Sequence, residues 1–114
     1  MTFHRIEIRP SDESVVVEAG GERIAASDRA LVLSEGRLPE RIYLPLEDVR
    51  DGLLTPTDTS THCPFKGDAS YWSLTVGGET YEDAAFAYVH PRGGVDQIAG
   101  LICFLHDEVE TRVG

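Results

Sequence analysis

The sequence is poor in lysine, tryptophan and cysteine. Among its 114 residues, Lys66 is the only lysine and Trp72 the only tryptophan, and Cys63 and Cys103 are the only cysteines. Two cysteines are too few for the disulfide framework of a small secreted domain. We therefore expect two free thiols, with Cys103 buried as a small hydrophobic residue.

The sequence also lacks long hydrophobic runs. No apolar stretch approaches the roughly 20 residues that a membrane-spanning helix needs. The first six residues, Met-Thr-Phe-His-Arg-Ile, contain no apolar signal core and no small-residue cleavage site. These absences predict a cytoplasmic protein that does not enter a membrane.

The sequence is also poor in positively charged residues. Ten basic residues stand against twenty acidic ones, which gives a formal net charge of −10 at pH 7. Polyanions bind to clustered cations, whereas the arginines here are scattered among carboxylates. Nucleic acids and anionic membrane surfaces are therefore excluded as expected partners, and the acidity serves solubility.

What the sequence does contain predicts a mainly β fold in a single domain, residues 1–114. Two Gly-Gly pairs, at 20–21 and 77–78, follow β-branched or alternating runs and are typical of hairpin turns with positive φ at both positions. We expect an antiparallel sandwich or distorted barrel of about seven to nine strands. The expected strands are 4–9, 14–19, 22–26, 30–35, 41–44, 70–76, 80–81, 84–90 and 101–105.

One or two short helices complete the expected fold. Residues 46–54 have helical spacing, with acidic residues in the first turn, where the helix dipole favours them. Residues 95–109 fit either a helical stripe or a helical turn at 95–99 followed by the strand at 101–105, and we favour the second. Residues 55–69 show no hydrophobic period and are expected to form a long loop, which in a compact domain is usually functional.

The predicted loop contains the most distinctive motif, Cys63-Pro64-x-Lys66-Gly67. Cys63 is a candidate nucleophile whose pKa the Lys66 ammonium would lower, although a thiol packed under the turn is the simpler interpretation. Alternatively, Lys66 forms an anion-binding corner with Arg29 or Arg50, helped by backbone N–H groups around Gly67.

Neither a metal nor a cofactor is predicted. The possible ligands occur without a Cys-x-x-Cys or His-x-x-x-His pair; they are His4, His62, Cys63, His90, Cys103 and His106. Glu47, Asp48 and Asp51 form the densest acidic group, but no Gly-Ser motif precedes them, so the pattern of a metal-dependent nucleotidyltransferase is missing.

Several blocks of the sequence together resemble one protein family. They are residues 24–31, 43–50, 61–67, 69–72, 83–88 and 98–100, followed by Phe104, and include Tyr-Leu-Pro-Leu-Glu-Asp-Val-Arg and Thr-His-Cys-Pro-Phe-Lys-Gly. In these blocks the chain is similar to the domain of unknown function 427 family. The resemblance implies a small, mostly β domain and no established reaction, although the family is sometimes labelled nucleotidyltransferase-like. Ala26 and Phe86 depart from the acid and the tryptophan that the family often has there.

These patterns predict a small-molecule binding domain whose pocket is rimmed by the Cys-Pro-x-Lys-Gly motif, with an anionic or carbonyl-bearing ligand. The candidate ligand-binding residues are Arg29, Glu35, Tyr43, Arg50, His62, Gly67, Tyr71, Trp72 and Tyr88. One alternative is an enzyme that uses Cys63 or Lys66 covalently, with Tyr43, Tyr71 or Glu35 as proton carrier. Another is a protein-interaction domain, and a homo-oligomer is compatible with each hypothesis.

Overall fold

Antiparallel strands dominate the computed structural model, which describes residues 5–64, 66–93 and 95–114. Strands and bridges hold 60% of the described residues, which confirms the predicted mainly β domain. The elements, in order, are β1 (Ile6–Pro10), β2 (Val15–Ala19), β3 (Glu22–Ser27), β4 (Leu31–Glu35), β5 (Arg41–Tyr43), the 3-10 helix η1 (Leu46–Asp48), β6 (Leu54–Cys63), β7 (Gly67–Val76), β8 (Glu79–Tyr88), the 3-10 helix η2 (Asp96–Ile98), β9 (Cys103–Phe104) and β10 (Val109–Val113).

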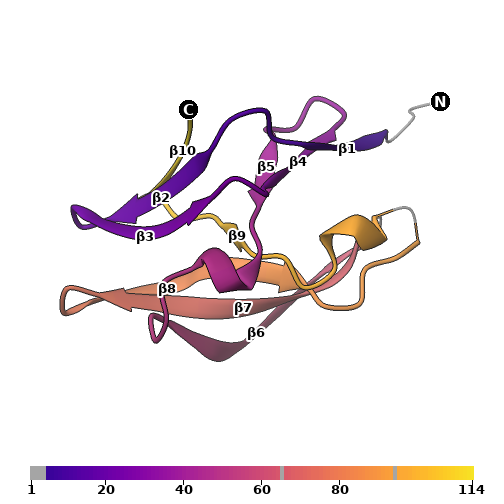
Figure 1. Ribbon diagram of the computed structural model, residues 1–114. Helices are drawn as coiled ribbons and strands as arrows, with labels where there is room; N and C mark the ends of the chain where they lie inside the picture. The colour runs from indigo at the N-terminus through magenta and orange to yellow at the C-terminus, as the bar shows by residue number, and fades with distance from the viewer. Residues whose placement is uncertain (1–4, 65, 94) are drawn as a thin grey trace.

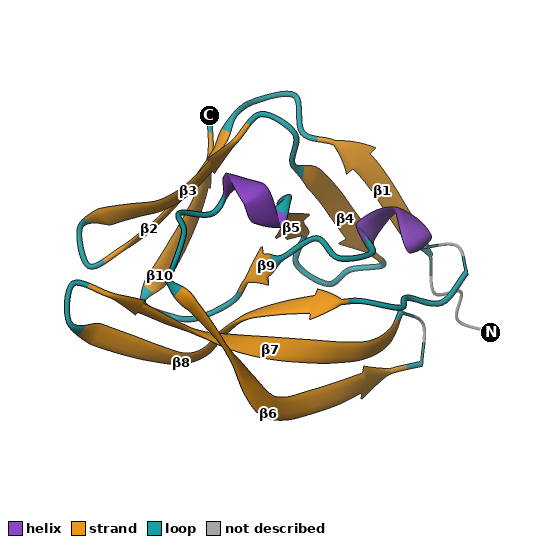
Figure 2. Cartoon of the chain, turned by 60° about the horizontal axis from the view of Figure 1, so that its bottom comes forward, coloured by secondary structure: helices purple, strands orange, loops and turns teal. Residues whose placement is uncertain are grey.

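The strands form three sheets in two layers. One layer is the four-stranded sheet β6-β7-β8-β9, and the other consists of two three-stranded sheets, β1-β4-β5 and β10-β2-β3 (Figure 1). Within the described part of the chain none of these sheets closes into a barrel, so the sandwich is the better of the two predicted architectures. Figure 2 shows the same separation after rotation, with β9, an edge strand of the large sheet, nearest the two small sheets.

Each small sheet encloses its own hydrophobic core against the large sheet. Core 1 joins β2, β3 and β10 to the large sheet and is built on Val15, Val17, Ile24, Leu74 and Ile102. Core 2 joins β4 and β5 to the other end of the large sheet and is built on Leu33, Tyr43, Phe86, Ile98 and Cys103. Burial of these apolar side chains holds the two layers together.

Both predicted Gly-Gly turns are confirmed. Gly20 and Gly21 have φ of 58° and 79°, and Gly77 and Gly78 have φ of 60° and 81°. These are the left-handed conformations that a type I′ hairpin requires and that glycine adopts without steric cost. The turns close the hairpins β2–β3 and β7–β8, which lie side by side in both views.

The predicted loop at 55–69 is wrong. Residues 54–63 form β6, an edge strand of the large sheet, and β7 begins at Gly67. Most of β6 is exposed on both faces, so its sequence has no hydrophobic period to reveal it. The β-branched residues Thr55, Thr57, Thr59 and Thr61 were the available signal, because threonine favours extended backbone.

The Asp83 carboxylate stabilises an irregular part of the large sheet. The register of β6 on β7 shifts between Pro56 and Ser60, and β8 has an irregularity at Asp83, whose φ is 50°. The hydroxyls of Thr57 and Thr59 each donate to Asp83 at 2.6 Å. These two hydrogen bonds, the Thr57 bond first, hold the pKa of Asp83 below its usual range.

A second consequence of the irregular register is that β7 serves both cores. Ala69 and Tyr71 pack on core 2, whereas Leu74 and Val76 belong to core 1. The register on β8 shifts between Trp72 and Leu74, between these two parts of the strand. Trp72 also packs on core 1, so the predicted grouping of Trp72 with Leu74 and Val76, apart from Tyr71, is confirmed.

The remaining corrections concern element ends. The one or two helical turns predicted within 46–54 are found as the single turn η1, whereas the predicted strand at 84–90 ends at Tyr88. The turn at 95–99 and the strand at 101–105 are found as η2 and β9, but the sequence did not predict β10, which brings the described strands to ten. His4, at the start of the first predicted strand, and Phe65, in the motif, lie outside the described residues. None of the described helices is both long and apolar enough to span a bilayer.

The two-layer packing predicts a large cost for opening core 1. Leu74 is fully buried in it, whereas Leu46 on η1 is 54% exposed. We expect Leu74→Ala to lower the free energy of unfolding by about 2–5 kcal/mol through lost contacts and a cavity. Leu46→Ala, the matched control, should change it by about 0.5 kcal/mol or less. Urea denaturation of both variants provides the measurement, and equal effects would contradict the assignment of the core.

Candidate functional site

The only lysine of the chain is buried in an ion pair. Lys66 lies in the turn between β6 and β7, and its Nζ donates to Glu35 Oε1, at the end of β4, over 2.6 Å. The Lys66 and Glu35 side chains are 11% and 6% exposed. The bond connects the large sheet to the β1-β4-β5 sheet. Lys66 is therefore not the surface ammonium that the sequence suggested.

Aromatic rings surround this ion pair. Lys66 Nζ is 5.8 Å from the centroid of the Tyr88 ring, close enough for a cation–π contact. Phe86 packs edge-on against Tyr43 and Tyr88, with ring centroids 6.1 and 5.9 Å apart. Burial, followed by the proximity of Cys63, Tyr71 and Glu35, raises the pKa of Tyr88 to about 12. At neutral pH the Tyr88 phenol therefore keeps its proton and does not act as a base.

Tyr43 is the most enclosed of these phenols. Its side chain is fully buried, and its hydroxyl has no hydrogen-bond partner among the described residues. Burial, together with nearby Cys103, raises its pKa far above the usual value. Tyr43 therefore remains neutral, and a role as proton acceptor is disfavoured.

The two thiols lie in different environments. Both cysteines are free, as predicted; Cys103 is buried in core 2 and Cys63 is half-buried at its edge. Burial raises the pKa of Cys103 to about 12, although Arg41 and the backbone of Ile42 partly offset this effect. Cys103 is consequently an unreactive thiol, and Cys63 is the more accessible of the two.

Beside the buried pair, the motif rims an open recess of about 380 Å³, which we call the loop recess. Its lining residues are His62, Gly67, Asp68, Ser70, Val89, His90 and Arg92. Gly67 has a φ of 110°, and a Cβ there would lie 3.3 Å from the His90 carbonyl oxygen. Only glycine lets the chain after β8 approach β7 this closely.

Backbone hydrogen bonds fix the shape of the loop recess. The amide of Arg92 donates to the Lys66 carbonyl at 2.9 Å, and the Lys66 amide donates to the Cys63 carbonyl at 3.2 Å. Lys66 thus anchors the turn inward through its ammonium while its backbone supports the recess outside. On the rim, His62 Nδ1 lies 2.6 Å from Asp68 Oδ1.

The predicted anion corner of Lys66 with Arg29 or Arg50 is not formed. Arg29 pairs with Asp48 on η1 at 2.9 Å, and Arg50 pairs with Glu22 at 3.4 Å. Arg50 lines a different recess, of about 520 Å³, between β3 and the η1 segment. The sequence did not show that both arginines have carboxylate partners of their own.

The other candidate residues divide into two groups. Glu35, Tyr43, Tyr71 and Tyr88 gather around core 2, and His62 and Gly67 line the loop recess. Trp72 packs against core 1, which favours a structural role for this side chain. Arg92 was missed, because only the tertiary contact of its turn with Gly67 brings it to the motif.

No group of three or more histidine, cysteine or acidic side chains in the described ranges could hold a metal ion.

The buried ion pair predicts a stability effect opposite to that of a surface lysine. Lys66→Met removes the ammonium that faces the buried Glu35 carboxylate, and we expect the free energy of unfolding to fall by about 3–5 kcal/mol. Lys66→Met combined with Glu35→Gln should recover much of this loss, because the buried charge is removed. Chemical denaturation of the single and double variants tests this, and a single variant as stable as the wild type would contradict it.

The raised pKa of Cys103 predicts alkaline destabilisation. In the unfolded chain a thiol titrates near pH 8.5, whereas folded Cys103 holds its proton up to about pH 12. Its contribution to stability is therefore complete below about pH 8.5 and is lost as the pH rises towards 12. The slope is at most about 1.4 kcal/mol per pH unit for one proton.

Cys103→Ala should flatten this dependence between pH 9 and 10. Denaturation curves at several pH values provide the measurement. Identical slopes for the wild type and the Cys103→Ala variant would contradict the assignment.

Comparison with known proteins supports one relationship. The family described as "Domain of unknown function (DUF427)" matches residues 7–113, nearly the whole chain. A search of the curated proteins finds no match. The match confirms the resemblance drawn from the sequence blocks, and the chain therefore belongs to the DUF427 family.

Proposed function

We propose that the protein is a small-molecule binding domain that holds an anionic ligand in the loop recess. The observation that carries this proposal is the position of Arg92. Its side chain lines the recess, and it forms no ion pair with a described residue. In a chain with a net charge of −10, a guanidinium without a carboxylate partner is available to a ligand.

The recess has properties of a ligand site. Its volume of about 380 Å³ falls in the usual range for small-molecule pockets. His62, His90 and Ser70 supply polar groups, and Val89 supplies an apolar surface. The close contact of Gly67 with the 90–92 turn fixes these groups before a ligand arrives, which reduces the entropic cost of binding.

A carboxylate or phosphate group fits this set of residues best. Arg92 can donate two parallel hydrogen bonds to the oxygens of either group. Asp68 is the one carboxylate of the lining, and its contact with His62 reduces its repulsion of an anion. A carbonyl group beside the carboxylate could accept from Ser70.

The enzyme hypothesis has less support. Covalent catalysis by Lys66 requires a neutral amine that substrate can reach, whereas this amine is buried and bonded to a carboxylate. Cys63 is half-buried, and its neighbouring His62 is engaged with Asp68. Binding without covalent chemistry is therefore the better proposal.

The test compares two arginine variants. Phosphate, acetate, pyruvate and citrate are titrated into ¹⁵N-labelled protein, and the amide shifts of Gly67 and Ser70 are followed. We expect at least one anion to shift both amides, and Arg92→Gln to weaken its binding about tenfold or more, because a charge-assisted hydrogen bond contributes about 1.5–3 kcal/mol.

Arg37→Gln is the matched control, since Arg37 is exposed and lies outside the recess lining. It should leave the affinity unchanged. The proposal fails if no anion produces a saturable shift of these amides, or if both variants weaken binding equally.

A further inference from the structure

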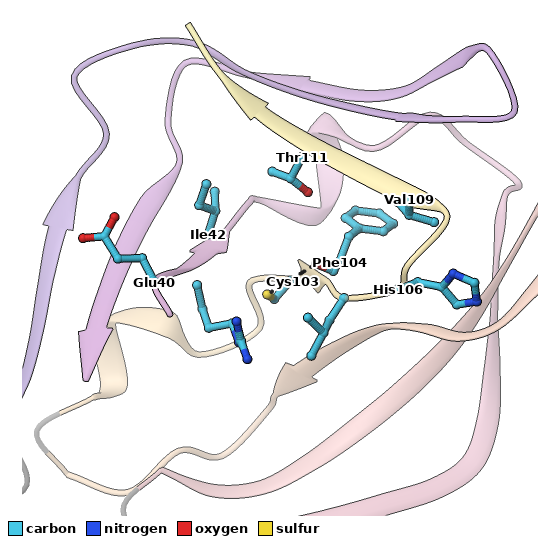
Figure 3. Close-up of a pocket in the computed structure, with 9 residues that line it drawn as sticks. Glu40, Ile42, Cys103, Phe104, His106, Val109 and Thr111 are labelled. Atoms are coloured by element: carbon cyan, nitrogen blue, oxygen red, sulfur yellow. Dashed lines mark hydrogen bonds between the residues drawn. The ribbon is translucent and has the colours of Figure 1, made fainter. Parts of the chain in front are cut away.

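The two small sheets leave a groove between them. Its lining residues, 40–42 and 103–106 among them, are separate from the Cys-Pro-x-Lys-Gly motif. A recess of about 210 Å³ lies between β5 and β10, with β9 on its floor, and Figure 3 shows Ile42 and Thr111 on opposite sides above Cys103 and Phe104. A second recess of about 300 Å³ shares Glu40 and Ile42 with the first and reaches Val113. Together they form one groove along β10, which we call the β5–β10 groove.

Both walls of the groove are edge strands. β5 ends the sheet β1-β4-β5, and β10 ends the sheet β10-β2-β3. The two strands are not paired with each other. Edge strands carry backbone donors and acceptors that can pair with another extended chain.

The register shows which backbone groups of β10 face the groove. The Gly114 amide donates to Ser14 on the β2 side, whereas the Val109 amide donates to His106 on the other side. Successive residues of a strand alternate in direction, so Thr111 and Val113 direct their N–H and C=O groups away from β2. Neither amide has a backbone hydrogen bond outside the sheet among the described residues.

The opposite wall offers fewer backbone groups. Leu44 exchanges two 2.8 Å hydrogen bonds with Ile102, which sets the alternation of β5 so that Ile42 also faces outward. β5 has only three residues, and Leu44 directly after it is already bonded to Ile102. β10 is therefore the main pairing edge.

The side chains of the groove indicate the character of its occupant. Leu105 and Val113 are 51% and 48% exposed, and they lie in the two different recesses. Arg41 forms no ion pair with a described residue, whereas Arg9 is already bonded to Glu40 at 2.9 Å. The groove thus combines exposed apolar surface with the cation of Arg41 in the first recess, whereas the carboxylates of Asp12 and Glu13 line the second recess, beside Val113.

We propose that the β5–β10 groove binds an extended peptide segment of a partner protein, which pairs with β10 as an added strand. Its apolar side chains would cover Leu105 and Val113, and an acidic side chain or terminal carboxylate would meet Arg41. Outward amides on every second residue of a five-residue strand, about 17 Å long, match a peptide backbone rather than a compact metabolite.

The first experiment tests whether the edge is open. Amide hydrogen exchange should be nearly unprotected at Thr111 and Val113, and about 100-fold slower at Glu110 and Arg112, which face β2. Equal protection of the four amides would show that the edge is already paired and would overturn the proposal.

The second experiment selects a peptide. A display library of random peptides of about nine residues is screened against the wild type, with Thr111→Arg as the counter-selection bait, because an arginine there fills the groove. Thr80→Arg, on an exposed position of β8, is the control and should retain every selected peptide. The best peptide should protect the Thr111 and Val113 amides and should lose binding when its alternate amides are N-methylated.

Arg41→Gln provides a variant that leaves the backbone edge intact. It should weaken that peptide about tenfold if an acidic group meets Arg41. The proposal is overturned if no peptide distinguishes the wild type from Thr111→Arg, or if selected peptides protect other amides. It is also overturned if sedimentation shows a dimer in which β10 of each copy protects these amides without peptide.

Discussion

The bond between Lys66 and Glu35 is the contact on which the candidate site depends. It joins the turn between β6 and β7 to the end of β4, so that the two layers meet through a buried charge as well as through apolar side chains. A buried pair contributes little net stability, because removing both charges from water offsets their attraction. Its effect is geometrical. The hydrogen bond to Glu35 fixes the position of the Lys66 ammonium, and the turn between β6 and β7 is thereby held in place.

That constraint divides the motif into an inner and an outer half. The Lys66 side chain and Cys63 face core 2, whereas Gly67 and the Lys66 carbonyl face the 90–92 turn. Cys63 and Lys66 therefore contribute to the interior, while Gly67 and the Lys66 backbone shape the recess outside it.

Sequence patterns predicted the elements that have one buried face or a glycine turn. β2, β3, β8 and the two Gly-Gly hairpins follow this rule. β6 was not predicted, because neither of its faces is buried and its sequence therefore lacks the alternation of apolar and polar residues that indicates a strand. The pairing of Lys66 with Glu35 and the position of Arg92 were not predicted either, since both depend on contacts between segments that are distant in the sequence. The motif directed attention to the turn between β6 and β7, and only the three-dimensional packing showed that the Lys66 side chain is buried there.

The carboxylate of Asp83 has a consequence for self-association. β6 is an exposed edge of ten residues, the kind of edge along which proteins add strands and aggregate. Its middle is bent away from regular pairing, because Thr57 and Thr59 are tied to Asp83. A neighbouring chain would have to break both bonds to align there. Regular strand pairing along the middle of this edge is therefore disfavoured.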